Sequence, residues 1–228
     1  MAKKKKNANY VTEKTESAKL EREATEKKEH SKKTVKTVLI LFLVAVLIVG
    51  LVIGLGFALG LFDYYPEATY HLSMVVEDYG AVHIELYGND APKTVEAFTK
   101  LCEDGYFDGK SLHTFLDGLL YCGSLDADGG KNGIKGEFSD NGVTNKISHK
   151  KGIISLAHGE GADSGYGQFF IVTEDSPELD GKYAAFAMIT DGMDIIEKII
   201  EDADMDENGL ISIPTRAYIE SISGHAHH

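Results

Sequence analysis

An uninterrupted apolar run, VLILFLVAVLIVGLVIGLGFALGLF, occupies residues 38–62 and divides the chain into two unequal parts. It contains 25 residues and no charged or strongly polar side chain. About 20 such residues are enough for a helix to cross the hydrocarbon core of a bilayer. A buried helix of a soluble domain rarely stays apolar on every face for so long. Residues 37–62 are therefore predicted to form a transmembrane helix.

The charges that flank this run predict its orientation. Residues 1–36 contain twelve Lys or Arg against six Glu, a net charge of +6, and after the run no Lys or Arg precedes Lys93. Because cytoplasmic flanks carry the excess of Lys and Arg, the N-terminus is predicted to be cytoplasmic and the larger part extracytoplasmic. A cleaved signal peptide is the competing interpretation, but the long charged lead and the length of the run fit an uncleaved anchor better.

The remaining chain divides into a linker at 63–69, a folded domain at 70–224 and a His-containing tail at 225–228. Subtracting +6 from the total net charge of −13 leaves −19 after residue 36, which argues against nucleic-acid binding by the folded domain. Within the apolar run the glycines form two GxxxG patterns, which allow a weak helix dimer, although glycine is common in membrane helices anyway. These glycines are Gly50, Gly54, Gly56 and Gly60.

Many short strands and two isolated helices are predicted in the folded domain. A helix at 90–101 has Asp90 as its expected N-cap and Pro92 in its first turn, and a second helix is expected at 193–203. This mainly β pattern favours a barrel whose ends are covered by helices. The predicted strands lie at 70–76, 81–86, 119–123, 153–157, 169–173, 185–189 and 217–222.

The segment GIISLAHGEGADSGYGQFFIVT at 152–173 is predicted to be two strands joined by a glycine-rich loop. Period-2 alternation puts Gln168, Phe170 and Val172 on one face of the second strand, and Phe169 and Ile171 on the other. An aromatic ring beside a neutral amide is suited to binding a peptide. The alternative, left open by this stretch alone, is that both faces are buried core.

Several segments together resemble the cyclophilin-type peptidyl-prolyl cis-trans isomerases, over about residues 73–223. The resemblance implies an eight-stranded closed β-barrel capped by two α-helices, no cofactor, no metal, and an outer groove that takes an X-Pro peptide. The segments that carry it are TVEAFTKLC, GKSLHTFLDGLLYCGS, GIISLAHG, GQFFIVT and LDGKYAAFAMITDGMDIIEKI.

The resemblance also implies roles for individual residues. Phe170 would form the floor of a proline pocket, Gln168 would hold the substrate backbone, and His113 and Thr114 fall in the motif that carries the catalytic arginine. The implied apolar walls are Leu119, Leu120 and Leu179, and the implied remainder of the groove is Cys122, Ala157, His158 and Tyr183.

Departures from the family pattern concern the chemistry. Thr114 stands where the family has an arginine that donates to the prolyl nitrogen, and Cys122 replaces the glutamine that steadies that arginine. Tyr183 replaces a groove histidine, and Glu178 stands where many members have Trp. Because losing one transition-state donor typically costs about 10²- to 10³-fold in rate, weak catalysis is expected unless His113, Tyr183 or Lys110 substitutes.

Two functions therefore remain from the sequence. The first is a membrane-anchored prolyl isomerase that assists the folding of extracytoplasmic proteins. The second is a catalytically impaired module that binds proline-containing peptides. Cys102 and Cys122 are expected to be buried thiols, although an extracytoplasmic location would also permit a disulfide between them. The segment DMDENG at 204–209 resembles the start of a calcium loop but lacks its final glutamate, so an acidic turn is expected there.

Overall fold

The computed structural model describes residues 27, 35–36, 38–52, 64, 66–126 and 129–226. The chain divides into two compact units, Met1–Asp63 and Tyr64–His228. Each unit is described by itself below.

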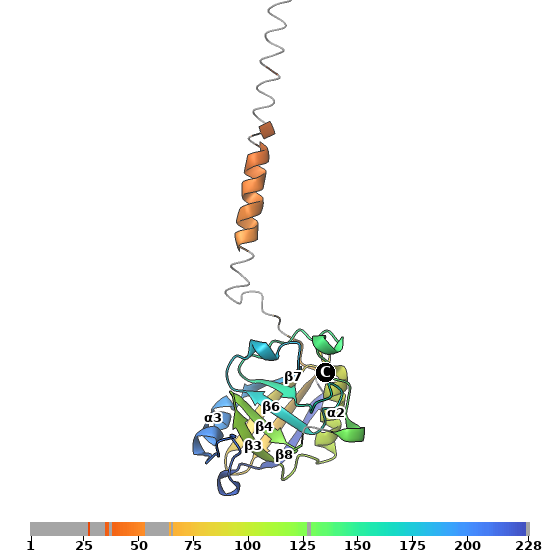
Figure 1. Cartoon of the computed structure of the whole chain (residues 1–228), viewed down its shortest axis with the longest axis vertical. Helices are drawn as coiled ribbons and strands as arrows, with labels where there is room; N and C mark the ends of the chain where they lie inside the picture. The colour runs from red at the N-terminus through yellow and green to blue at the C-terminus, as the bar shows by residue number, and fades with distance from the viewer. Residues whose placement is uncertain are drawn as a thin grey trace, which may run out of the picture. The chain divides into compact units, whose positions relative to one another are not determined.

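In the first unit, residues 38–52 are helical (the orange helix in Figure 1). Their large apolar side chains are exposed. No helix within the described residues is both long enough and apolar enough to cross a membrane. The rest of the predicted span, residues 53–62, lies outside the described part of the chain, and so do Gly54, Gly56 and Gly60.

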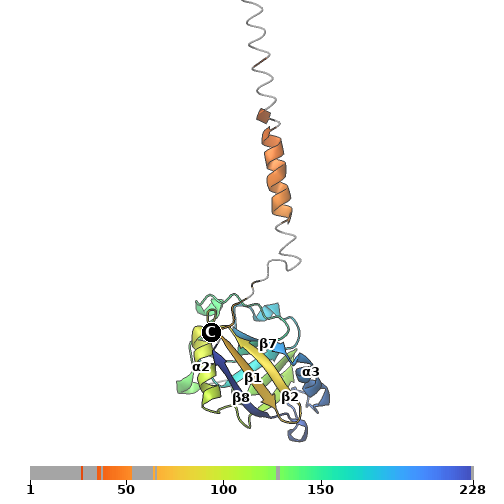
Figure 2. The ribbon, with the colours of Figure 1, turned by 180° about the vertical axis from the view of Figure 1, so that it is seen from behind.

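The second unit is built on eight antiparallel strands in the spatial order β3-β4-β6-β5-β7-β2-β1-β8. Figures 1 and 2 show the two sides of this curved sheet. The strands are β1 (Tyr70–Val76), β2 (Gly80–Leu86), β3 (Ser111–Leu116), β4 (Leu119–Gly123), β5 (Ile153–Leu156), β6 (Gln168–Val172), β7 (Ala184–Asp191) and β8 (Ile219–Ala226). The sequence predicted all of them except β3.

The sheet is a half-barrel, which corrects the prediction of a fully closed barrel. Its outermost strands, β3 and β8, share no ladder in the described part of the chain. The start of β3 meets the segment leading into β8 through the bridge Ser111–Tyr218 and through backbone hydrogen bonds such as that from the Ile219 N–H to the Lys110 carbonyl (2.7 Å). Farther along β3 the partner is the loop after α3 (Met193–Asp202) instead, because Thr114 pairs with Leu210 and the Phe115 N–H donates to the Gly209 carbonyl (2.8 Å). This loop occupies the strand edge that a closed barrel would give to β8.

The two predicted helices are confirmed, with altered ends. Helix α2 (Pro92–Glu103) packs on β7 and β8, and α3 packs on β2. The predicted cap of α2 is wrong: Asp90 accepts a hydrogen bond from the Tyr64 hydroxyl (2.9 Å), and Ala91 occupies the N-cap position. Glu137, 43 residues away, caps the helix instead by accepting from the Thr94 N–H (2.8 Å).

The predicted alternation along β6 is confirmed. Phe169 and Ile171 belong to the main core inside the half-barrel, whereas Phe170 and Val172 belong to a smaller apolar cluster on the outer face. Both faces are therefore buried. The outer cluster, which we call the Phe170 cluster, contains Tyr87, Leu119, Ile147, Ile153, Ala157, Phe170, Val172 and Ala185.

The predicted tail is shorter than expected, because β8 continues to Ala226. His225 pairs with His71 of β1 in the ladder, and their rings lie 6.0 Å apart between centroids. Residues 227–228 lie outside the described part of the chain.

Candidate functional site: the outer face around Phe170

Phe170 is fully buried, with 0% of its surface exposed, although it lies on the outer face of β6. Three rings enclose it: Tyr183 stands edge-on at 5.2 Å between centroids, Tyr121 at 5.6 Å, and His149 is stacked at 6.3 Å. Leu179 packs against the same cluster. The expected open proline pocket with Phe170 as its floor is thus a closed aromatic cluster in this structure.

Only some of the residues predicted to line the proline pocket lie near Phe170. Leu119 lies in the Phe170 cluster, but Leu120 and Cys122 are fully buried in the main core, and the Cys122 thiol donates to the Leu120 carbonyl (3.5 Å). The register of β4 explains this correction: Cys122 pairs with the inward-facing Phe169, so its side chain and that of Leu120 point into the half-barrel. Neither can wall a pocket over Phe170.

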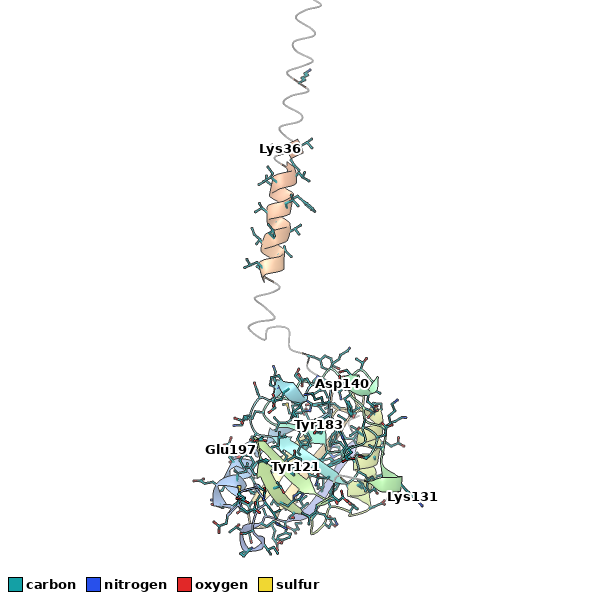
Figure 3. The ribbon with its side chains drawn as sticks, in the orientation of Figure 1. Lys36, Tyr121, Lys131, Asp140, Tyr183 and Glu197 are labelled. Atoms are coloured by element: carbon teal, nitrogen blue, oxygen red, sulfur yellow. The ribbon has the colours of Figure 1, made fainter. Side chains whose placement is uncertain are left out.

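The same register brings a residue to the site that the sequence analysis missed. Tyr121 pairs with Phe170 on β6 and with Thr114 on β3. Alternation from Leu119 along β4 contained this signal, since residues two apart share a face. Figure 3 labels Tyr121 and Tyr183, whose partly exposed rings lie on the outer face.

Gln168 and His113 converge on one backbone oxygen. The Gln168 side-chain amide donates to the Ser124 carbonyl (2.6 Å), and Nε2 of His113 lies 3.0 Å from the same oxygen. Because a carbonyl can only accept, Nε2 carries the ring proton of neutral His113. Burial lowers the pKa of His113, which keeps the ring neutral. The carbonyl oxygen of the Gln168 amide is left to accept from a ligand.

The Thr114 hydroxyl already makes a hydrogen bond to the neighbouring residue, His113. Nδ1 of His113, which lacks a proton in this tautomer, lies 2.9 Å from the Thr114 hydroxyl and accepts its hydrogen. The nearby cations have partners too, because the Arg216 guanidinium donates to the Ile211 carbonyl (3.1 Å from Nε) and Lys110 lies over the Tyr106 ring at 5.0 Å. The structure thus places no free cation at the position of the expected arginine among the described residues.

Ala157, a member of the cluster, and its neighbour His158 follow the end of β5. The Ala157 N–H donates to the Gln168 carbonyl (3.0 Å), so this donor is used within the protein. The His158 ring is stacked between Phe138, at 5.4 Å, and Tyr183, at 4.8 Å. The Tyr183 ring therefore contacts two other rings: it stacks on His158 and stands edge-on to Phe170.

A chain of hydrogen bonds runs under the cluster. His149 contacts Asp180 through Nδ1 (2.8 Å) and the Ser155 hydroxyl through Nε2 (2.8 Å). The order of these groups is that of a serine hydrolase, but Ser155 is 0% and His149 2% exposed, so no substrate reaches the hydroxyl. Because the His149 ring stacks on Phe170, this series of hydrogen bonds supports the Phe170 ring.

The other predicted motifs contribute no chemistry to this face. No group of three metal-ligating side chains is found in the described part of the chain. In the 204–209 turn, Asp206 uses its carboxylate to accept from the N–H groups of Asn208 (2.8 Å) and Leu210 (2.9 Å). Cys102 and Cys122 are free thiols.

Residues 71–220 match the family described as cyclophilin type peptidyl-prolyl cis-trans isomerase, and this chain belongs to that family. It is 33% identical over 125 residues to peptidyl-prolyl cis-trans isomerase B of Bacillus subtilis, an overlap of 55% of this chain and 87% of that protein. A peptidyl-prolyl cis-trans isomerase of Helicobacter pylori is 34% identical over 122 residues, 53% of this chain and 74% of that protein.

The fold is shared with solved structures as well. A crystal structure of a Cryptosporidium parvum cyclophilin type isomerase, solved in the presence of the dipeptide Ala-Pro, superimposes with a TM-score of 0.56 at 22% identity. The match covers 69% of this chain and 99% of that one. At this identity the likeness establishes the fold.

Proposed function

We propose that this chain is a membrane-anchored peptidyl-prolyl isomerase that acts on X-Pro bonds of extracytoplasmic proteins. The family assignment supports the isomerase activity, and the curated relatives carry that name. The anchor and the location are supported by the apolar run at residues 38–62 and by the basic flank before it.

The reaction requires no nucleophile. Rotation about an X-Pro bond faces a barrier of about 18 to 20 kcal/mol, because the planar amide loses its resonance on twisting. A catalyst therefore needs an apolar surface for the proline ring, a group that holds the flanking backbone, and a donor for the prolyl nitrogen in the twisted state.

The observation that carries the proposal is the Phe170 cluster beside the Gln168 amide. Tyr121 and Tyr183 present partly exposed aromatic surface, and Gln168 keeps its carbonyl oxygen available once its amide is fixed on Ser124. A proline ring packs well on aromatic faces. The dipeptide Ala-Pro present with the Cryptosporidium relative supports a proline-containing ligand for this chain too.

Substrate binding requires a movement in this site, because Phe170 is completely covered. The arriving proline meets Tyr121 and Tyr183 first. Tyr183 is partly exposed and packs at the edge of the cluster, so a rotation that moves its ring away would uncover Phe170.

The test is an exchange assay by NMR on an Ala-Pro peptide with the full chain in detergent micelles, comparing Phe170→Ala with Val172→Ala. Val172 lies in the same cluster, two residues along the same strand, and controls for loss of packing. Acceleration by the wild type and by Val172→Ala, absent in Phe170→Ala, is expected. Peptide binding without acceleration in the wild type would make the chain a binding module instead.

Localisation is tested separately. An alkaline phosphatase fused after residue 226 is active only outside the cytoplasm, so high activity in cells is expected. Replacing three of the residues 47–51 by Lys should abolish membrane retention of the fusion, because charged residues at the helix centre oppose insertion. A fusion that stays in the soluble fraction with the native run would overturn the anchor.

A further inference from the structure

The geometry points to the hydroxyl of Tyr121 as the hydrogen-bond donor to the prolyl nitrogen, in place of an arginine at position 114. This inference rests on the proposed isomerase activity. It assigns a catalytic role to a residue that the sequence patterns did not single out.

The first argument is position. Tyr121 lies between two residues of the site, because its cross-strand partners are Thr114 on β3 and Phe170 on β6. Residues paired across an antiparallel sheet share a face, with Cβ atoms about 4.5 to 5.5 Å apart. A phenol at this point lies beside a proline that packs on the Phe170 cluster, and it reaches farther from the sheet than the Thr114 hydroxyl.

The second argument is availability. Among the described residues, the Tyr121 hydroxyl makes no hydrogen bond, and its ring is partly exposed. Burial of the ring raises the pKa of Tyr121 above its usual value of 10.0, so the phenol keeps its hydrogen at neutral pH. The group is thus an uncommitted neutral donor at the edge of an apolar cluster.

The third argument is that His113, Thr114 and the two nearest cations already use their donors within the protein. His113 gives its ring hydrogen to the Ser124 carbonyl, and the Thr114 hydroxyl gives its hydrogen to His113. The Arg216 guanidinium is held by the Ile211 carbonyl, and Lys110 lies over Tyr106. A ligand that displaced any of these would have to break an existing contact.

The chemistry is a transient hydrogen bond. As the amide twists, the lone pair of the prolyl nitrogen leaves conjugation and becomes a better acceptor, so a fixed O–H stabilises the twisted state more than the planar one. No bond to the protein forms, and the phenol keeps its proton when the amide becomes planar again.

Tyr70 provides the control. It lies on β1, its ring is partly buried against the main core inside the half-barrel, and it is not part of the Phe170 cluster. Replacing either tyrosine by Phe removes one oxygen and leaves the ring packing.

The experiment measures kcat/KM for an Ala-Pro peptide and its Kd by NMR titration in the full chain, Tyr121→Phe and Tyr70→Phe. Tyr121→Phe is expected to lower kcat/KM about 10- to 100-fold with an unchanged Kd, and Tyr70→Phe to stay within about twofold of the wild type. Adding Thr114→Arg to Tyr121→Phe should restore the rate, which a purely structural defect would not allow.

Two results would overturn the assignment, and they are distinguishable. If the wild type accelerates exchange and Tyr121→Phe does so equally well, Tyr121 is not the donor although the isomerase stands. If the wild type gives no acceleration at all, the proposed activity fails and the donor role fails with it.

Discussion

Nδ1 of His113 lies 2.9 Å from the Thr114 hydroxyl, and Nε2 of the same ring lies 3.0 Å from the Ser124 carbonyl. The two contacts together fix the direction of both hydrogen bonds, since the carbonyl cannot donate. The hydroxyl at position 114 is therefore a donor within the protein. The Thr114 hydroxyl cannot replace an arginine as donor to the prolyl nitrogen for two reasons. Its side chain is too short, and its hydrogen is already given to His113.

Restoring an arginine at position 114 should increase catalysis. Thr114 is partly exposed and shares the outer face with Tyr121, so an arginine there can reach a proline on the Phe170 cluster. We expect Thr114→Arg to raise kcat/KM about 10- to 100-fold in the exchange assay, as for one added transition-state donor. Thr114→Met, which has similar length and no donor, is the control and should leave the rate unchanged. A rise with Met would show that length or apolar contact matters, and not the donor.

Stability should fall on acidification because two buried histidines are held neutral. Burial lowers the pKa of both His113 and His149 below the usual 6.5. The unfolded chain then binds more protons than the folded one, so this contribution to stability is complete above about pH 6.5 and is lost as the pH falls below it. Urea midpoints at pH 8 and pH 5 should show a smaller drop for His149→Gln than for the wild type. An equal drop would assign the pH dependence to other groups.

The two cysteines should react very differently with thiol reagents. Cys122 is fully buried and Cys102 is partly exposed on α2, where burial raises the pKa of its thiol to about 12. Because the thiolate is the reactive form, the native chain should label slowly at Cys102 and at Cys122 only after unfolding. Mass spectrometry of labelled Cys102→Ser checks this. Label on native Cys102→Ser would mean that β4 opens locally.

The sequence predicted the outward face of β6 correctly and that of β4 incorrectly, for a physical reason. β6 follows a glycine-rich loop, and period 2 puts Gln168, its one polar residue, on the same face as Phe170 and Val172. In β4, Leu119, Leu120 and Tyr121 are all apolar or aromatic, so residue type does not tell which side faces the core, although alternation puts Leu119 and Tyr121 on one face. Motif similarity then placed Leu120 and Cys122 in the groove, whereas the ladder to β6 places Tyr121 there.

Contacts between segments that are distant in the sequence could not be predicted from it, for a related reason. Local pattern selects a cap from the residue just before a helix, which is why Asp90 was expected for α2. The cap that the structure uses comes from Glu137, and the closure of β8 on β3 is limited by a loop near Leu210. Such partners depend on how distant segments pack together, and the spacing of residues in the sequence does not predict them.

Removing the Glu137 carboxylate should destabilise the domain more than removing Asp90. Glu137 is 3% exposed and accepts from the N–H groups of Lys93 (3.1 Å) and Thr94 (2.8 Å) and from the Thr94 hydroxyl (2.8 Å). Glu137→Ala leaves these donors without an acceptor at the positive end of α2, and we expect a loss of about 2 to 3 kcal/mol in the free energy of unfolding.

Asp90→Ala is the matched control, because the sequence favours that residue as the cap, while the one partner of its carboxylate among the described residues is the Tyr64 hydroxyl. A loss of about 0.5 to 1 kcal/mol is expected for this variant, since one hydrogen bond near the surface is removed. Urea denaturation followed by circular dichroism measures both. If Asp90→Ala cost as much as Glu137→Ala, the local cap would be the important one, and the long-range cap described above would contribute little to the stability of α2.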